Sequence, residues 1–222
     1  TRYTPHATQM GTAKQLRAVL DSHGLTHALL VAAQPYGRDN ACLLDAIAAS
    51  DGRFKGIALV DPALSEQELA KLADRGIVGL RMNLSSYGMR EFQEPGVDRL
   101  LAMARELRWF LQIHCQHDEL VEAAPILRKA GLRLMIDHFG RPEVRRGIGQ
   151  PGFQALLDLG RSTEAVVKLS GPFRSSIEGY PYCDLDPFIQ AAIEALTLKN
   201  CVWGSDWPFT RTDQHVDYGP GF

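Results

Sequence analysis

Two histidines and an aspartate stand at the ends of three short apolar runs. His114 ends the run WFLQIH, His138 follows RLMID, and Asp206 follows CVWGS. Two imidazoles and a carboxylate are the ligand types of a Zn²⁺ site, and without metal the same groups serve as a general acid and base. Arg81 and Asn83 end a fourth run, VGLRMN. The pattern therefore predicts acid–base chemistry, with or without a metal ion.

Each of these residues also has a purely structural explanation. A lone histidine at a strand end is commonly a satisfied structural histidine, and Arg81 could pair with a structural carboxylate. Asp206 precedes Trp207–Pro208 and could cap a turn. The joint pattern is more specific, because four polar groups on four different strands would meet at one rim.

The apolar runs alternate along the chain with amphipathic segments. The runs are nearly continuous in apolar residues, as strands buried on both faces are; they are His27–Gln34, Phe54–Asp61, Val78–Leu84, Trp109–Cys115, Arg133–Phe139, Ala165–Gly171 and Cys201–Asp206. Segments with helical periodicity include Thr12–Ser22, Asn40–Ser50, Ser65–Arg75, Val97–Leu107 and Asp118–Ala130. Ser65 and Glu68 form a capping box, and Gly76 and Gly131 stand where helices should end.

This alternation predicts a parallel α/β architecture, since successive strands begin roughly 24 to 36 residues apart. A doubly wound sheet is an alternative, but no GxGxxG turn follows any strand. Polar residues at the strands' C-terminal ends favour a (β/α)₈ TIM barrel, whose sites lie at that rim. Only seven strands are visible, and Phe209–Phe222 is short and loop-like. We expect one domain over residues 1–222 that lacks the barrel's first strand and last helix in the chain as given.

Side-chain alternation along the strands indicates which groups share a face. Gln112 lies on the face of His114, so Cys115 should face the helices, which argues against a nucleophilic cysteine. Ile136 and His138 share a face in this scheme, with Asp137 opposite. If the face with Gln112 and His114 and the face with Ile136 and His138 both point into the barrel, then His114, His138, Asp206 and Arg81 converge. The remaining histidines are expected at the surface: His6, His23, His27, His117 and His215.

Composition excludes several classes of protein. The 222 residues carry 24 Lys and Arg against 26 Asp and Glu, a net charge of -2, which argues against a nucleic-acid partner. No apolar run approaches the roughly 20 residues that span a bilayer, and Thr1–Met10 lacks the plan of a signal peptide. The four cysteines form no CxxC pair. A cytoplasmic enzyme without a membrane partner is expected.

Four motifs resemble those of the amidohydrolase superfamily: MIDHFGRP (Met135–Pro142), VWGSDWPF (Val202–Phe209), GLRMN (Gly79–Asn83) and VKLSGPFR (Val167–Arg174). More narrowly, they are similar to its branch of 2-pyrone-4,6-dicarboxylate lactonase-like hydrolases, which includes sulfomuconolactonases and sugar-acid lactonases. QPYGRDN and DPALSEQELAKL also fit, so the resemblance covers nearly the whole chain. DHxGRP followed by WGxDWP is the specific pair.

The resemblance implies roles for individual residues. In this family the first strand ends in HxH, which occurs nowhere in this sequence and is expected upstream of Thr1. His138 matches the histidine of the sixth strand and Asp206 the aspartate of the eighth. His114 matches a position that is histidine in metal-binding members and tyrosine in the pyrone-dicarboxylate lactonase, which resembles a metal-independent enzyme. The implied substrate-binding residues are Arg81, Arg174 and Arg141, with Gln34 and Asn83 as further candidates.

The implied reaction is hydrolysis of a small anionic, carboxylated lactone through a tetrahedral oxyanion. A Zn²⁺ held by His114, His138, Asp206 and the upstream HxH would lower the pKa of a bound water to near 7. Asp206 would take the proton of the water and return it to the leaving oxygen. Without metal, Asp206 would act as the base and His138 as its electrophilic or acidic partner.

Two other functions are compatible with the sequence. One is a zinc-dependent decarboxylase of the same superfamily, and the other is a non-catalytic ligand-binding barrel. Hydrolysis of a phosphate or an amide is a further option. A homo-oligomer is compatible with each of them.

Overall fold

The computed structural model describes residues 10–212 and residue 216. Seven parallel strands form one sheet, in which each strand pairs with the next along the chain. They are β1 (Ala28–Val31), β2 (Phe54–Ala58), β3 (Ile77–Asn83), β4 (Phe110–His114), β5 (Arg133–Ile136), β6 (Val166–Ser170) and β7 (Cys201–Gly204). Six of the seven predicted runs contain a whole strand, and β3 begins one residue before the third run.

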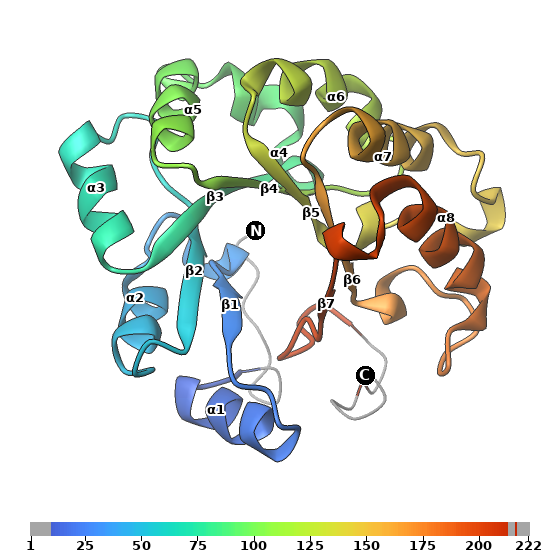
Figure 1. The fold of residues 1–222 in the computed structure, drawn as a ribbon, viewed down its shortest axis with the longest axis horizontal. Coiled ribbons are helices and arrows are strands. Elements are labelled where there is room, and N and C mark those ends of the chain that lie inside the picture. The colour runs from blue at the N-terminus through green and yellow to red at the C-terminus, as the bar shows by residue number, and fades with distance from the viewer. Residues whose placement is uncertain (1–9, 213–215, 217–222) are drawn as a thin grey trace.

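The sheet curls into an arc, and the helices lie along its outer side (Figure 1). These are α1 (Ala13–Ser22), α2 (Ala41–Ala48), α3 (Glu66–Asp74), α4 (Leu84–Tyr87), α5 (Val97–Glu106), α6 (Glu119–Ala130), α7 (Pro151–Ser162) and α8 (Asp186–Leu196). Strand, helix and strand follow one another throughout, and β1 and β7 are the edges of the described sheet. This is the architecture of a partial (β/α)₈ barrel.

Local sequence signals fix several helix ends. Ser65 and Glu68 form the expected capping box at α3, and Thr12 and Gln15 form a second one at α1. Gly131 ends α6 in the left-handed conformation, with φ 62°, which glycine adopts without the steric cost of a Cβ. These ends set how each helix returns the chain to the next strand.

The two faces of the sheet differ in chemistry. Leucines and isoleucines of β4 and β5, such as Leu111, Ile113 and Ile136, pack in the hydrophobic core. The residues that alternate with them include buried Gln112 and, beyond the end of β5, buried Asp137. Apolar side chains thus pack toward the helices, while polar ones line the concave interior of the arc.

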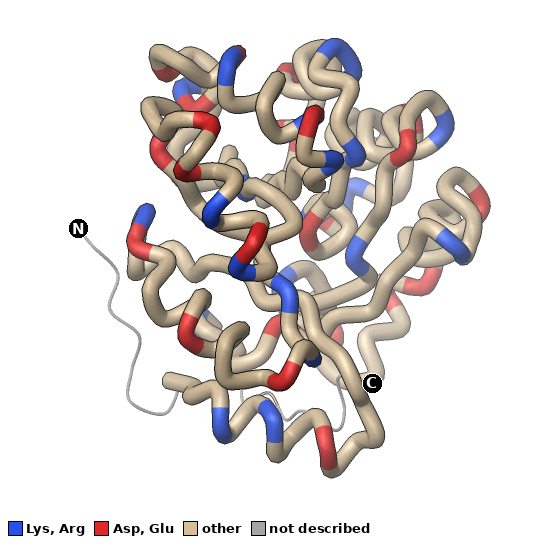
Figure 2. The backbone as a smooth tube through the Cα atoms, turned by 60° about the vertical axis from the view of Figure 1, so that its left-hand side comes forward, with Lys and Arg blue, Asp and Glu red and all other residues tan. Residues whose placement is uncertain are grey.

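Charged residues of both signs are interspersed along the outer elements (Figure 2), in keeping with the net charge of -2. Among the described residues, no helix has the length and hydropathy needed to span a bilayer.

Candidate active site

The strand ends bring His114, His138 and Asp206 together. The rings of His114 and His138 meet edge to face, with centroids 5.7 Å apart. His138 Nε2 lies 3.7 Å from Asp206 Oδ1. The predicted convergence of these three side chains at the C-terminal end of the sheet is therefore present in the structure.

The predicted orientation of Asp137 is wrong. Strand register pairs Arg81 with Gln112 and Gln112 with Met135, so these three side chains face the same side. Asp137 is two residues beyond Met135 and also points inward, while Ile136 packs in the core. His138 reaches the interior only because the chain turns after β5, with φ 49° at His138 and 37° at Phe139. Alternation ends at this turn.

Asp137 is the centre of a buried polar cluster. Its two oxygens accept hydrogen bonds of 2.9 Å from Gln112 Nε2, and Oδ2 accepts one of 3.1 Å from an Arg81 nitrogen. Lys168 Nζ lies 3.1 Å from Oδ1 and donates to Gln112 Oε1 at 2.8 Å. His114 Nδ1 faces Oδ2 at 3.6 Å.

Electrostatics keeps this carboxyl ionised. Burial opposes the charge, but Lys168 and Arg81 hold the pKa of Asp137 well below its ordinary value. Sequence reasoning missed both Asp137 and Lys168. The available signal for Lys168 was a lysine in the middle of an otherwise apolar strand, AVVKLSG.

Burial also makes both histidines neutral near pH 7. It lowers the pKa of His138 to about 4, although Asp206 and Asp137 oppose the shift. Burial likewise lowers the pKa of His114. Neutral imidazole offers one nitrogen lone pair and one N–H. The Nδ1 of His138 is hydrogen-bonded to Ser170 Oγ at 2.8 Å, so its Nε2 faces Asp206.

The Asp206 carboxylate is held from one side by Arg174. The Nε and a terminal nitrogen of Arg174 both contact Oδ2, and this guanidinium also donates to the Thr210 carbonyl at 3.0 Å. The other carboxylate oxygen remains directed at His138. Asp206 therefore makes side-chain contacts across the site, and the turn it begins is closed by a backbone bond from Phe209 to its carbonyl.

Gly171 makes room for this arrangement. Its φ is 58°, and a Cβ at this position would lie 3.0 Å from His138 Nδ1 and 3.3 Å from Asp206 Oδ2. A side chain here would press on both candidate catalytic groups.

Arg141 has unused hydrogen-bonding capacity. Its Nε is buried and makes no hydrogen bond within the described residues. Burial lowers the pKa of Arg141, and repulsion from the positive charge of Arg174 lowers it further. A bound anion would relieve this repulsion and take the free N–H.

The other predicted substrate-binding residues already hold protein partners. Arg81 bonds to Asp137 and to the Ala32 carbonyl. Asn83 Nδ2 donates to Gln34 Oε1 at 2.8 Å, and Gln34 Nε2 donates to the Tyr87 hydroxyl at 2.5 Å. Hydrogen bonds of Asn83 and Gln34 therefore connect the chain segments at the C-terminal ends of the strands, beside the site.

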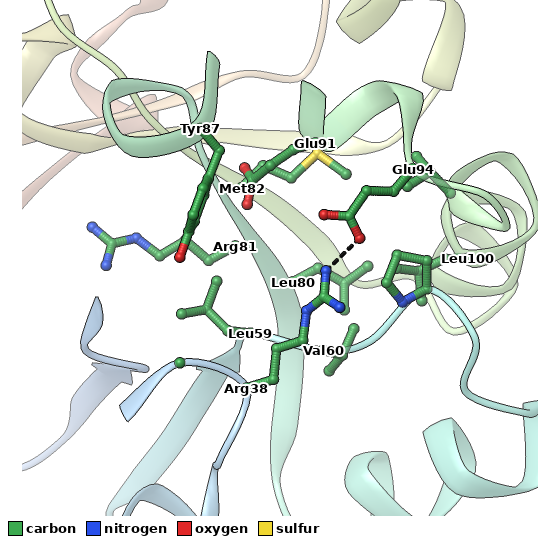
Figure 3. A pocket seen from close by; sticks show the side chains of 13 residues that line it. Arg38, Leu59, Val60, Leu80, Arg81, Met82, Tyr87, Glu91, Glu94 and Leu100 are labelled. Atoms are coloured by element: carbon green, nitrogen blue, oxygen red, sulfur yellow. Dashed lines mark hydrogen bonds and ion pairs between the residues drawn. The ribbon is translucent and has the colours of Figure 1, made fainter. Parts of the chain in front are cut away.

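A cavity of about 310 Å³ lies next to Arg81 but on the outer side of β3 (Figure 3). Leu80 and Met82 line it and alternate with Arg81, whose guanidinium points away from the Arg38–Glu94 ion pair in the figure. The Glu91 carboxylate accepts the Asn83 N–H, and burial raises its pKa to about 7. This cavity is separate from the histidines.

Three of the five histidines that were expected at the surface lie within the described residues. His23, His27 and His117 are exposed, whereas His6 and His215 lie outside the described residues. Cys115 is buried in the core, and burial raises the pKa of its thiol well above the ordinary value. A nucleophilic role for Cys115 is therefore unsupported.

Some of the side chains at the site are spaced closely enough to hold one metal ion. Two ligand atoms about 2.0–2.2 Å from one Zn²⁺ lie within about 4.4 Å of each other, and His138 Nε2 and Asp206 Oδ1 are 3.7 Å apart. His114, Asp137 and His138 also offer atoms within 4.8 Å of one another. Asp137 is the poorer ligand, because its oxygens already receive Arg81, Gln112 and Lys168.

Comparisons with known proteins identify a family and several similar proteins. The family model described as Amidohydrolase matches residues 4–222. The 4-sulfomuconolactone hydrolase of Rhizobium radiobacter is 32% identical over 192 residues, which cover 86% of this chain and 64% of that protein. The 2-pyrone-4,6-dicarboxylate hydrolase of Comamonas testosteroni is 29% identical over 227 residues, which cover 97% of this chain and 72% of that protein.

A solved structure is similar over the whole chain. It is a probable 2-pyrone-4,6-dicarboxylic acid hydrolase from Acinetobacter baumannii with citric acid bound, with a TM-score of 0.89 and 31% identity. The match covers 100% of this chain and 82% of that one. Of the two 4-sulfomuconolactone hydrolases that it matches, the chain spans about two thirds of the length.

Proposed function

Because the chain belongs to the amidohydrolase family, we propose that it hydrolyses a small lactone bearing two anionic groups. The observation that carries the proposal is the His138–Asp206 pair, set beside the guanidiniums of Arg174 and Arg141. A proton acceptor and anion-binding groups then surround one reacting centre. The relatives named above as hydrolases of sulfomuconolactone and pyrone dicarboxylate support this substrate class.

The charge of the interior supports an anionic substrate. Arg81, Lys168, Arg174 and Arg141 outnumber the carboxylates of Asp137 and Asp206 in this cluster. The excess persists when Glu119, which contributes to the electrostatics of Arg141, is included. Arg141, with its free Nε, is the residue best placed to bind a substrate carboxylate or sulfonate.

Asp206 is the proposed proton carrier. Arg174 holds Oδ2, and this leaves Oδ1 to accept a proton from the attacking water. The same oxygen returns the proton to the ring oxygen that leaves when the ester bond breaks. Proton acceptance and return by one carboxylate keep the reaction balanced: water adds and a hydroxy acid forms.

His138 is the proposed electrophilic partner. A carboxylate opposite Nε2 favours the proton on that nitrogen, and Ser170 then donates to Nδ1. In this tautomer, Nε2–H can donate to the carbonyl oxygen as negative charge develops on it. The low pKa of His138, about 4, keeps the ring neutral during turnover near pH 7.

A zinc-bound form is the alternative version of the proposal. His114, His138 and Asp206, together with the HxH motif that the family resemblance implies, would hold the ion, which would polarise the ester and acidify a water. In that form His138 Nε2 would offer its lone pair to the metal, and the ion would replace the Nε2–H as the electrophile. Asp206 keeps its role as proton carrier whether or not the ion is bound.

The test is a panel of lactones with zero, one or two anionic groups, assayed with and without a chelator. We expect hydrolysis to be fastest for the doubly charged lactones, and Arg141→Ala to remove that preference. Equal rates for neutral and charged lactones would contradict the proposed substrate class. Release of CO₂ without ring opening would indicate the decarboxylase alternative instead.

The proposal places the enzyme in the cytoplasm, with a small-molecule partner and neither nucleic acid nor membrane. The four cysteines are free thiols, as is usual in a reducing compartment. Assembly into a homo-oligomer is part of the same proposal, and sedimentation of the purified protein tests it.

A further inference from the structure

Asp137 joins four neighbouring strands of the barrel interior. It follows β5, and its partners Arg81, Gln112 and Lys168 stand on β3, β4 and β6. Its side chain is only 3% exposed. A carboxylate this deeply buried with several partners is held in one orientation.

This orientation directs one carboxylate oxygen at His114. Oδ2 lies 3.6 Å from His114 Nδ1, and Nδ1 is buried and makes no hydrogen bond within the described residues. An imidazole beside an acceptor-only group keeps its proton on the nitrogen that faces that group. The Nε2 of His114 is then left with its lone pair.

We propose that Asp137 is a positioning residue that fixes the Nδ1–H tautomer of His114 and the orientation of its ring. The Arg81–Gln112–Lys168 cluster holds the carboxylate in place for this purpose. His114 in turn packs edge to face against His138, so its orientation bears on the ring that faces Asp206. The kinetic consequence rests on the proposed lactone hydrolysis, whereas the tautomer does not.

The first test is spectroscopic and needs no substrate. In ¹⁵N-histidine-labelled protein as isolated, the two ring nitrogens of His114 are distinguished by their chemical shifts, and the His114→Gln variant assigns them. At pH 8 the lowered pKa of His114 keeps its ring neutral. We expect a protonated Nδ1 and an unprotonated Nε2. The opposite tautomer in the wild-type protein would overturn the proposal.

The second test separates positioning from charge balance. Asp137→Asn leaves Arg81 and Lys168 without their buried counter-ion, so this single variant should lose stability as well as activity. The double variant Asp137→Asn/Lys168→Met removes one cation together with the carboxylate and should recover most of the melting temperature. Its kcat should stay about 10–100-fold below wild type, the range expected when a group that orients a functional histidine is lost.

Lys168→Met alone is the reference variant: Asp137 keeps its bonds to Arg81 and Gln112, so kcat should fall less than in the double variant. Recovery of kcat in the double variant would show that Asp137 only balances charge. A loss in Lys168→Met equal to that of the double variant would assign the effect to the lysine. If the protein opens no lactone, the proposed function fails, while the tautomer measurement still decides the role of Asp137.

Discussion

Replacing Arg174 by alanine removes the group that holds the proposed proton carrier. The Arg174–Asp206 pair is largely buried, with side chains 12% and 23% exposed. Breaking a fully buried ion pair costs about 3–5 kcal/mol, and breaking an exposed one costs at most about 1 kcal/mol. At this intermediate burial, we expect the free energy of unfolding to fall by about 2–3 kcal/mol, or about 4–12 °C in melting temperature.

The kinetic effect follows from the freedom that Asp206 gains. With Oδ2 unpaired, the carboxylate can rotate away from His138, and a misplacement of about 1 Å can cost up to about 100-fold in rate. We expect kcat to fall about 10–100-fold for neutral and charged lactones alike. KM should rise mainly for the charged ones, because a cation is lost from the site.

The assay is steady-state hydrolysis of one neutral and one dianionic lactone, together with thermal unfolding. Arg146→Ala is the matched control, since Arg146 makes a 2.7 Å ion pair with Asp118 at the surface. Its melting temperature and kcat should stay close to wild type. Wild-type kcat in Arg174→Ala on both lactones, with only KM raised, would refute the positioning of Asp206 by Arg174.

Three further predictions test neighbouring features. Gly171→Ala should lower kcat about 10-fold or more with a modest loss of stability, because its Cβ would press on His138 and Asp206; unchanged kcat would contradict the described packing. Arg141→Ala should raise KM for dianionic lactones at least 10-fold more than for neutral ones, as steady-state kinetics would show. The pKa of Glu91 is raised from 4.5 to about 7, so its protonated form stabilises the fold below pH 4.5 and this stabilisation is lost as pH rises through 7. Denaturant unfolding should show up to about 3 kcal/mol of decline across this window, and Glu91→Gln should remove it.

The sequence carried enough information for the parallel sheet and its order. Continuous apolar runs separated by amphipathic segments indicated buried parallel strands, and a strand lies within or overlaps each of the seven runs in the structure. The capping residues Ser65 and Glu68 marked a helix start because their hydrogen bonds are local. His114, His138 and Asp206 could be assigned to one rim, since parallel strands end at the same edge.

The orientation of groups beyond the strand ends could not be derived in the same way. Alternation assumes extended backbone, but the chain leaves β5 after Ile136 and turns through positive φ at His138 and Phe139. Asp137 and His138 therefore both reach the interior. The partners of Lys168 depend on long-range pairing with Asp137 and Gln112, which a single strand pattern does not encode.

The most direct test of Asp206 as the proton carrier is the turnover of Asp206→Asn on a dianionic lactone, measured beside its melting temperature. The substitution keeps the shape of the side chain but removes the oxygen that accepts the proton. We predict a fall in kcat of about 10²–10⁴-fold, with KM nearly unchanged and the protein folded. Near-normal turnover with a lowered melting temperature would contradict it, because Asp206 would then serve only the structure.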